Sequence, residues 1–159
     1  MHVLHVVVET PKGSTEKYDW NPKEKMFELN KILPVGMVFP FDFGFIPDTK
    51  GEDGDPLDAL IFSEFTSFPG CRVHARLIGG ITGKQKEGKG DWIRNDRFLF
   101  VPQPSVVYSD ANKVQDLSKK LIKGILTFLM TYNEKKEYEV IKIISREQTW
   151  ELIKAGHDA

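Results

Sequence analysis

The first two thirds of the chain consist of short apolar runs, rich in β-branched and aromatic residues, that turn residues separate. Runs of this kind are typical of strands. Between residues 34 and 47 Phe, Pro and Gly dominate, and Pro40 and Pro47 disfavour a helix there. We therefore expect strands at residues 3–8, 17–20, 26–29, 57–62, 73–78 and 98–101, with a later return strand at 138–144.

The last third changes to a helical period. Apolar residues recur every three or four positions, which predicts a helix over residues 110–132. Ser109 or Asp110 can cap its start. A capping box at residues 145–148 then opens a short second helix that ends near Gly156.

The order of these elements predicts a mainly β, α+β fold. Several short strands followed by a helix, a strand and a helix fit a small β-barrel on which two C-terminal helices pack. The pattern alone does not separate a closed barrel from an open sheet. With 159 residues and no internal repeat, the chain is expected to form a single domain over residues 1–159.

Composition narrows the class of protein. The 22 Lys and Arg residues nearly balance the 23 Asp and Glu residues, which argues against a nucleic-acid binder and against a polybasic membrane-surface protein. The sequence shows neither a membrane span nor a signal peptide. Its single cysteine, Cys71, cannot form an internal disulfide and favours a reducing compartment. We expect a cytoplasmic protein with no nucleic-acid or membrane partner.

The candidate chemistry lies in an acidic segment where Asp53, Asp55 and Asp58 fall within six positions. The residues before Pro56 also suit an ordinary acidic β-turn, and turn chemistry alone leaves both interpretations open for the first two aspartates. Asp58, however, lies inside an apolar strand, where an ionised carboxylate is costly unless it is paired or binds a metal. Crowded carboxylates repel one another, and a hard divalent cation such as Mg²⁺ relieves that repulsion. The segment therefore predicts a divalent metal site.

The same segment resembles the signature of the soluble family I inorganic pyrophosphatases, with three acids at fixed spacing around a proline. The resemblance runs from about Val7 to Tyr132. Further segments in the family's order and spacing are Val8-Glu9, Lys17-Tyr18-Asp19, Phe27 to Lys31, Phe39-Pro40, residues 43–47, Phe68-Pro69-Gly70 and Val101-Pro102. The resemblance implies a closed OB-like β-barrel and Mg²⁺-dependent hydrolysis of inorganic pyrophosphate to two phosphates by a metal-activated water.

The resemblance also implies a role for each matching position. Asp53 and Asp58 would be metal ligands, and Asp55 would orient or deprotonate the attacking water. Glu9 and Asp19 would support the acidic cavity. The substrate's phosphate oxygens would be held by basic and phenolic side chains, namely Lys17, Lys31, Arg97 and Tyr132. Mg²⁺ is the expected cofactor, with Mn²⁺ or another divalent cation as an alternative, and short members of the family are typically homo-oligomers.

A second pair of metal ligands is implied at Asp91 and Asp96, whose separation of five residues matches the family. That alignment requires an insertion in residues 84–89. Counting back from Val101-Pro102 instead places Asn95 at the second position. A hard cation prefers a carboxylate, which favours Asp96, but both registers stay open.

The chain departs from the family on its phosphate-binding side. Lys31 stands where the family has an arginine, which gives up two-pronged recognition of phosphate. Phe39 and Phe43 replace tyrosines, and further exchanges fall at Asp42, Arg97 and Asn133. These departures leave open an alternative function, that of a non-catalytic or altered-substrate homologue that binds a phosphorylated small molecule. Because every proposed acid is retained, we favour the enzyme.

Overall fold

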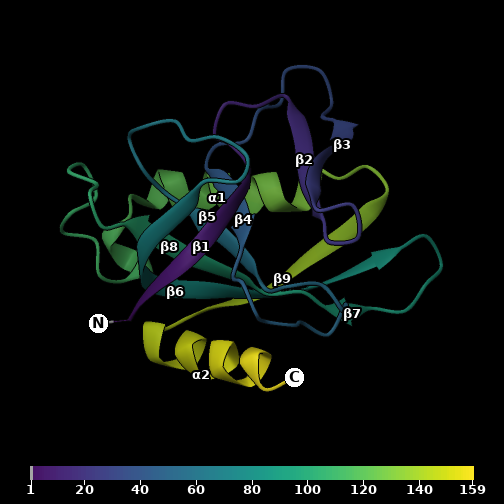
Figure 1. Ribbon diagram of the computed structural model, residues 1–159. Helices are drawn as coiled ribbons and strands as arrows, with labels where there is room; N and C mark the ends of the chain where they lie inside the picture. Colours follow the sequence, from purple (N-terminus) through teal and green to yellow (C-terminus); the bar gives the residue numbers. More distant parts are fainter. Residues whose placement is uncertain (1) are drawn as a thin grey trace.

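The computed structural model describes residues 2–159 and is shown in Figure 1. Its strands are β1 (Val3–Thr10), β2 (Glu16–Asn21), β3 (Met26–Ile32), β4 (Asp42–Phe45), β5 (Asp58–Ile61), β6 (Arg72–Glu87), β7 (Ile93–Arg94), β8 (Arg97–Pro102) and β9 (Lys136–Ile144). Its helices are the 3₁₀ helix η1 (Val114–Asp116), α1 (Lys119–Thr131) and α2 (Arg146–His157). None of the helices in residues 2–159 has the length and apolar character needed to cross a membrane.

Five of the strands close into a barrel. β1 pairs with β4, β4 with β5, β5 with β8 and β8 with β6, and β6 returns to β1. β5 and β8 run parallel, whereas the other neighbours in this ring are antiparallel. Closure removes the unpaired edges that an open sheet would expose. The predicted closed OB-like barrel with two C-terminal helices is therefore confirmed.

Two extensions leave the barrel. The second half of β6 pairs with β9 and ends in a hairpin with β7, which projects on the right of Figure 1. β2 and β3 form a separate two-stranded sheet, above that hairpin in the same view. These extensions carry several of the polar residues of the candidate site.

Two glycines permit close approaches that a side chain would prevent. A Cβ atom on Gly44 of β4 would lie 2.0 Å from the carbonyl oxygen of Val7 in β1. Gly79 of β6 has a φ of +153°, and a Cβ atom there would lie 2.5 Å from Val114 Cγ2. The pairing of β6 with β8 shifts register beside Gly79, which marks a bulge. Both glycines thus belong to the geometry that closes the barrel.

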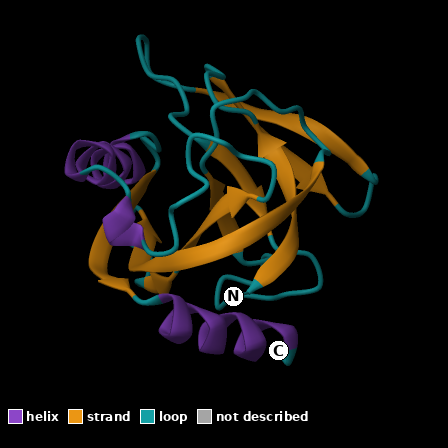
Figure 2. Ribbon diagram, turned by 90° about the vertical axis from the view of Figure 1, so that its left-hand side faces the viewer, coloured by secondary structure: helices purple, strands orange, loops and turns teal. Residues whose placement is uncertain are grey.

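The core consists of two apolar clusters, one against each long helix. β8 contributes to both, because successive residues of a strand point to opposite faces: Leu99 belongs to one cluster and Phe98 to the other. α1 packs Phe128 into the first cluster, and α2 packs Ile153 into the second. Figure 2 shows the two helices on different sides of the barrel. Each helix therefore shields its own part of the core.

Each predicted strand overlaps an observed one, although β5 (Asp58–Ile61) is one residue shorter at each end than the predicted strand at residues 57–62. The second helix begins as expected. Ser145 Oγ accepts the N–H of Gln148, and Gln148 Oε1 accepts the N–H of Ser145. β4 is not predicted from the sequence, because apolar and polar residues do not alternate in the Phe-, Pro- and Gly-rich stretch around it. β6 continues nine residues beyond the predicted strand end at residue 78.

The predicted start of the first helix is wrong. α1 begins at Lys119, and its cap is Ser118, whose hydroxyl accepts the N–H of Leu121. The preceding residues form turns and η1 instead. Buried Arg76 donates to the carbonyl oxygens of Tyr108 and Ala111, at 2.9 and 2.8 Å, and so takes up the backbone acceptors there. A tertiary contact thus overrides the apolar spacing.

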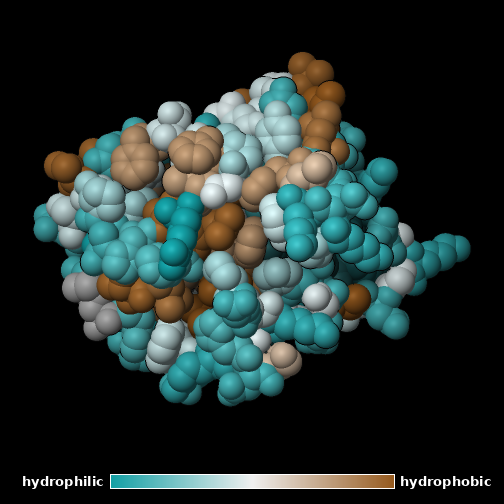
Figure 3. Space-filling view, viewed as in Figure 1, coloured by the Kyte–Doolittle hydropathy of each residue, from teal (hydrophilic) through white to brown (hydrophobic). Residues whose placement is uncertain are grey.

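Exposed apolar surface appears at several separate places on the face shown in Figure 3. Hydrophobic atoms gather at the upper right, over the loop that follows β3. Ile32 and Val35, at the end of β3 and in that loop, are both exposed. The projecting hairpin of β6 and β7, on the right of this view, is mostly hydrophilic, although Trp92 and Ile93 in it are exposed.

Candidate active site

A cavity of about 780 Å³ opens between the β2–β3 sheet, the loop from β4 to β5, and the extended parts of β6 and β9. Most residues predicted from the sequence line it, namely Glu9, Lys17, Asp19, Lys31, Asp53, Asp55, Asp58, Arg97 and Tyr132. They come from segments as distant as β1 and the end of α1. Because separate segments deliver polar side chains to one concave space, this cavity is the candidate active site.

The acidic loop, residues 48–57, is shaped by short-range hydrogen bonds. Gly54 N donates to Gly51 O at 3.0 Å, and Gly51 N donates to Asp55 O at 2.8 Å. Gly54 has a φ of +88°, which glycine adopts without strain. Asp53 Oδ1 accepts the N–H of Asp55 at 3.1 Å. The first two aspartates therefore form a tight turn and line the cavity at the same time.

The C-terminal end of α2 holds this loop in place. Lys50 N donates to Gly156 O at 3.0 Å, and His157 Nδ1 lies 3.0 Å from Asp48 O. Leu57 packs so closely against the helix that a Cβ atom on Gly156 would lie 2.5 Å from its Cδ1. α2 thus positions the acidic loop, although none of its own residues lines the cavity.

Asp53 and Asp55 carry uncompensated negative charge. Burial raises the pKa of Asp55 above its ordinary value, and the adjacent Asp53 carboxylate raises it further. Neither has an ion-pair partner in residues 2–159. In that part of the chain no three His, Cys, Asp or Glu side chains converge as a preformed metal site. A cation at this loop would therefore depend on these two carboxylates together with water.

Asp58 is paired, unlike the two aspartates before it. It begins β5 beside Arg97 of the parallel strand β8, and Arg97 Nη1 donates to its carboxylate. The same nitrogen donates to Asn95 Oδ1 at 2.6 Å. The guanidinium carbon lies 5.5 Å from the ring centroid of Phe43 and 5.0 Å from that of Tyr138. A buried cation, held on several sides, thus balances the strand carboxylate.

Glu9 belongs to the cavity wall at the end of β1. Its Oε2 accepts the N–H of Trp20 at 2.8 Å. Burial raises the pKa of Glu9 to about 7, although the hydrogen bond from Trp20 and the charge of Lys17 act in the opposite direction. Glu9 therefore keeps its proton to a higher pH than an exposed glutamate does.

Lys17 and Lys31 form the cationic wall of the cavity. They are cross-strand neighbours in the β2–β3 sheet. Lys17 pairs with Asp19, and Lys31 Nζ lies 5.7 Å from the ring centroid of Tyr132. Burial and the charge of Lys17 lower the pKa of Lys31. Two cations held together against their repulsion favour an anionic ligand between them.

Asp91 and Asp96 do not line the cavity. Asp91 is exposed, and Asp96 Oδ1 accepts the N–H of Gly83 at 3.1 Å, within the β6 region. Side chains alternate along an extended backbone, so Asn95 and Arg97 share one side and Asp96 takes the other. Of the two registers left open by the sequence, the cavity lining agrees with the one that selects Asn95.

Some lining residues were not predicted, among them Gln85, Glu87, Lys135 and Lys136. Gln85 and Glu87 lie in a stretch rich in Gly and Lys that has no strand pattern. Pairing of β6 with β9 brings them to the cavity, with Gln85 opposite Tyr138 and Glu87 opposite Lys136. The alternation of side chains along a strand is enough to place Asn95 on the same side as Arg97. No pattern in the local sequence, however, indicates that β6 pairs with β9.

Only some of the departures from the family lie at the cavity. Phe43 and Asn133 line it, whereas Phe39 and Asp42 do not. Phe39 is fully buried in the aromatic core. Asp42 is also buried, and its carboxylate accepts the N–H of Lys12 at 2.7 Å. The exchanges at Phe39 and Asp42 therefore concern packing and backbone support.

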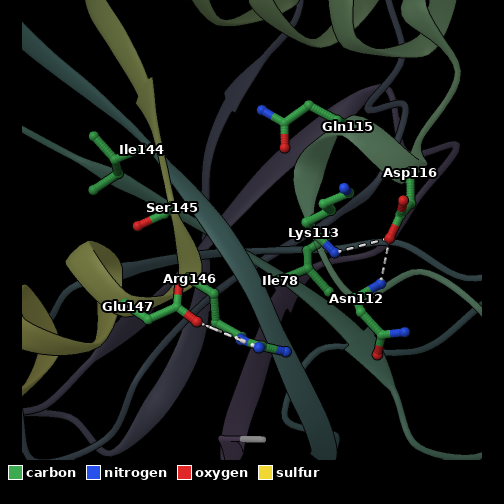
Figure 4. Close-up of a pocket in the computed structure, with 9 residues that line it drawn as sticks. All are labelled: Ile78, Asn112, Lys113, Gln115, Asp116, Ile144, Ser145, Arg146 and Glu147. Atoms are coloured by element: carbon green, nitrogen blue, oxygen red, sulfur yellow. Dashed lines mark hydrogen bonds and ion pairs between the residues drawn. The ribbon is translucent and has the colours of Figure 1, made fainter.

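A second cavity, of about 430 Å³, lies between η1 and the start of α2 (Figure 4). Asp116 accepts the backbone N–H groups of Asn112 and Lys113, and Arg146 pairs with Glu147. Its acidic side chains are thus occupied by neighbouring groups. No residue predicted to carry chemistry lines it.

Comparison with known proteins gives a consistent result. A family model described as "Inorganic pyrophosphatase" matches residues 6–159. The chain is 33% identical over 156 residues to the inorganic pyrophosphatase of Methanosarcina acetivorans, covering 98% of this chain and 87% of that protein. It is 35% identical over 144 residues to the inorganic pyrophosphatase of Saccharolobus solfataricus, covering 88% and 80% respectively.

Solved structures show the same likeness in three dimensions. The crystal structure of inorganic pyrophosphatase from Thermus thermophilus matches with a TM-score of 0.90 and 29% identity, covering 98% of this chain and 90% of that one. An inorganic pyrophosphatase from Neisseria gonorrhoeae matches with a TM-score of 0.87 and 31% identity, at 98% and 90% coverage. The likeness therefore includes nearly the whole chain.

Proposed function

The chain belongs to the inorganic pyrophosphatase family, and on that premise we propose that its cavity hydrolyses inorganic pyrophosphate to two phosphates. The observation that carries the proposal is the meeting of an acidic loop and a cationic wall in one cavity. The wall, with Lys17 and Lys31, can neutralise a phosphoanhydride. The loop, with Asp53 and Asp55, can activate a water molecule.

The acidic loop fits a divalent cation such as Mg²⁺. Asp53 and Asp55 offer carboxylate oxygens, which hard cations prefer, and a cation would relieve the repulsion between them. Mn²⁺ is an alternative, because it too accepts oxygen ligands. When bound, such a cation lowers the pKa of a coordinated water and neutralises phosphate oxygens. Asp53 is the expected ligand, and Asp55 lies directly beside it.

The protein's own side chains have separate roles in the hydrolysis. Asp55 accepts the proton of the attacking water, and Pro56 restricts the turn that displays it. Lys17, Lys31 and Tyr132 hold phosphate oxygens from the other wall. As the bond to the bridging oxygen breaks, negative charge develops on the departing phosphate, and these fixed groups balance it.

The test is release of phosphate from pyrophosphate with Mg²⁺, with excess chelator, and with each divalent metal in turn. We expect release that depends on Mg²⁺ and stops with chelator. Asp53→Asn should require a higher Mg²⁺ concentration for half-maximal rate. No release with any divalent metal would contradict the proposal and favour a protein that only binds phosphorylated small molecules.

We further propose that the protein is a cytoplasmic homo-oligomer. A free Cys71 as the single cysteine suits a reducing compartment. Along α1, Ile122, Leu126 and Met130 follow one another at intervals of four and are only partly covered by the chain itself. Such a stripe supports contact with a second copy.

A further inference from the structure

The acidic residues of the cavity fall into two electrostatic groups. Asp53 and Asp55 have no ion-pair partner in residues 2–159, whereas Asp58 is engaged by Arg97. Next to this pair, the lining side chain of Asn95 is a neutral amide. Asp58 is therefore the carboxylate that contacts Arg97 directly, and the guanidinium balances its negative charge.

Other polar groups of the neighbouring strands do not change this balance. Gln85 of β6, which also lines the cavity, is a second neutral amide. Glu87 follows on the same face of β6, but it is exposed and lies across the strand pair from Lys136. Asp96 points to the opposite side, where it accepts the N–H of Gly83. A divalent cation beside Asp58 would thus find few free oxygen anions.

Arg97 is held as a fixed cation. Its side chain is only 4% exposed, and it lies between the rings of Phe43 and Tyr138. The Tyr138 hydroxyl donates to the carbonyl oxygen of Asn95 at 2.9 Å, which fixes that ring. Arg97 Nε has no hydrogen-bond partner within residues 2–159, so its donors are not all used by the protein. Arg97 is therefore a cation fixed in place next to Asp58.

We propose that Arg97 is a built-in cation that takes the place of a metal ion beside Asp58, so that the substrate-free protein binds about one divalent cation per chain, at the acidic loop. Arg97 contacts Oδ2 of Asp58, so a metal on the other oxygen of that carboxylate would lie against a buried like charge, which is unfavourable. The inference rests on the proposed function, because it concerns how the same cavity balances the charge of pyrophosphate.

The test counts Mn²⁺ ions bound to the substrate-free protein, from the paramagnetic resonance signal of free Mn²⁺. We expect about one ion per chain for the wild type and for Arg97→Lys, which keeps the charge. Arg97→Gln frees the Asp58 carboxylate and should bind about two. Lys136→Gln is the matched control: it removes a cation from the same cavity but leaves the Asp58–Arg97 pair, so its stoichiometry should equal that of the wild type.

Two or more ions per wild-type chain would overturn the inference, as would a folded Arg97→Gln that binds no more Mn²⁺ than the wild type. If Arg97→Gln does not fold, the counts for the wild type and Arg97→Lys decide. A phosphate-release assay on the same samples separates the two proposals. Hydrolysis by a protein that binds two ions contradicts this inference alone, whereas one bound ion without hydrolysis contradicts the proposed function alone.

Discussion

Glu9 links the electrostatics of the cavity to the stability of the fold. Glu9 is half-buried in the cavity wall, and this burial raises its pKa from 4.5 to about 7. The folded protein therefore holds this proton more tightly than the unfolded chain does. The contribution of Glu9 to stability is therefore most favourable below pH 4.5 and declines as the pH rises to about 7, where the folded form also ionises this group.

Glu9→Gln should remove this pH dependence. The amide oxygen can still accept the N–H of Trp20, but no charge is buried. With chelator present, the variant and the wild type should be equally stable near pH 4.5. Above pH 7 the variant should be more stable, by at most about 3 kcal/mol. Chemical denaturation across this pH range is the measurement, and parallel stability curves would contradict the account.

Lys31 and Phe43 limit how tightly the cavity holds phosphate. Both line it, and Lys17 lies across the strand from Lys31 and 5.4 Å from the Phe43 ring. Lys31→Arg combined with Phe43→Tyr adds a guanidinium fork and a hydroxyl. Each new hydrogen bond to a charged phosphate contributes about 1.5–3 kcal/mol. KM for pyrophosphate should therefore fall at least about tenfold, as measured by steady-state kinetics.

Phe39→Tyr provides the matched control for that experiment. The side chain is fully buried in the aromatic core and does not line the cavity. Its new hydroxyl would be buried without an evident partner, so we expect lower stability, by about 1–3 kcal/mol, and an unchanged KM. If Phe39→Tyr lowers KM as much as the double variant does, the cavity is not the phosphate site.

At the scale of elements, α2 acts on the site through the loop that it holds. Gly156 provides the room for Leu57, and its carbonyl oxygen accepts the N–H of Lys50. Gly156→Ala places a methyl group 2.5 Å from Leu57 Cδ1, so Leu57 and the acidic loop must shift. We expect a loss of about 1–3 kcal/mol in unfolding free energy and a lower kcat.

Gly124→Ala is the control for Gly156→Ala. Gly124 also lies in a helix, α1, but a Cβ atom there meets nothing within 4 Å. This exchange should raise stability by up to about 1 kcal/mol and leave kcat unchanged. Equal effects of the two exchanges on kcat would show that α2 does not position the acidic loop.

Local patterns predict elements well where the contacts that decide them are also local. The capping box at Ser145 depends on a residue three positions away, and it is confirmed. The start of α1 depends on Arg76, which holds Ala111 from β6, and the spacing of apolar residues cannot reveal such a contact. The second half of β6 is likewise formed through a distant contact: it pairs with β9, and its own sequence has no strand pattern.

Across the whole molecule, the acidic loop could be predicted from sequence because its residues are neighbours in the chain. Asp53 and Asp55 share a turn, and Asp58 opens the following strand. The residues around Arg97 come from several strands, so their identity depends on register. The alternation of side chains along a strand places Asn95 on the same side as Arg97. The preference of a hard cation for a carboxylate ligand instead favours Asp96. The cavity lining follows the alternation of the strand, with Asn95 lining it and Asp96 on the other side.

Assembly is predicted from the apolar stripe of α1. Ile122, Leu126 and Met130 should contact a second copy, so light scattering at micromolar concentration should give a mass above that of one chain. Leu126→Glu places a charge in this contact and should shift the mass towards that of the monomer. Exposed Lys120→Glu, on the same helix but about 120° around its axis from Leu126, is the control. A monodisperse wild-type monomer would contradict the prediction.

The central claim is that the acidic loop carries out the hydrolysis, and kcat of Asp55→Asn tests it most directly. The exchange keeps the shape of the turn but removes the group that accepts the proton of water. We expect kcat for pyrophosphate with Mg²⁺ to fall by about 10²–10⁴-fold, with little change in KM. Asp110→Asn, an exposed exchange of the same type outside the cavity, should keep the wild-type rate. An Asp55→Asn variant with wild-type kcat would contradict the account.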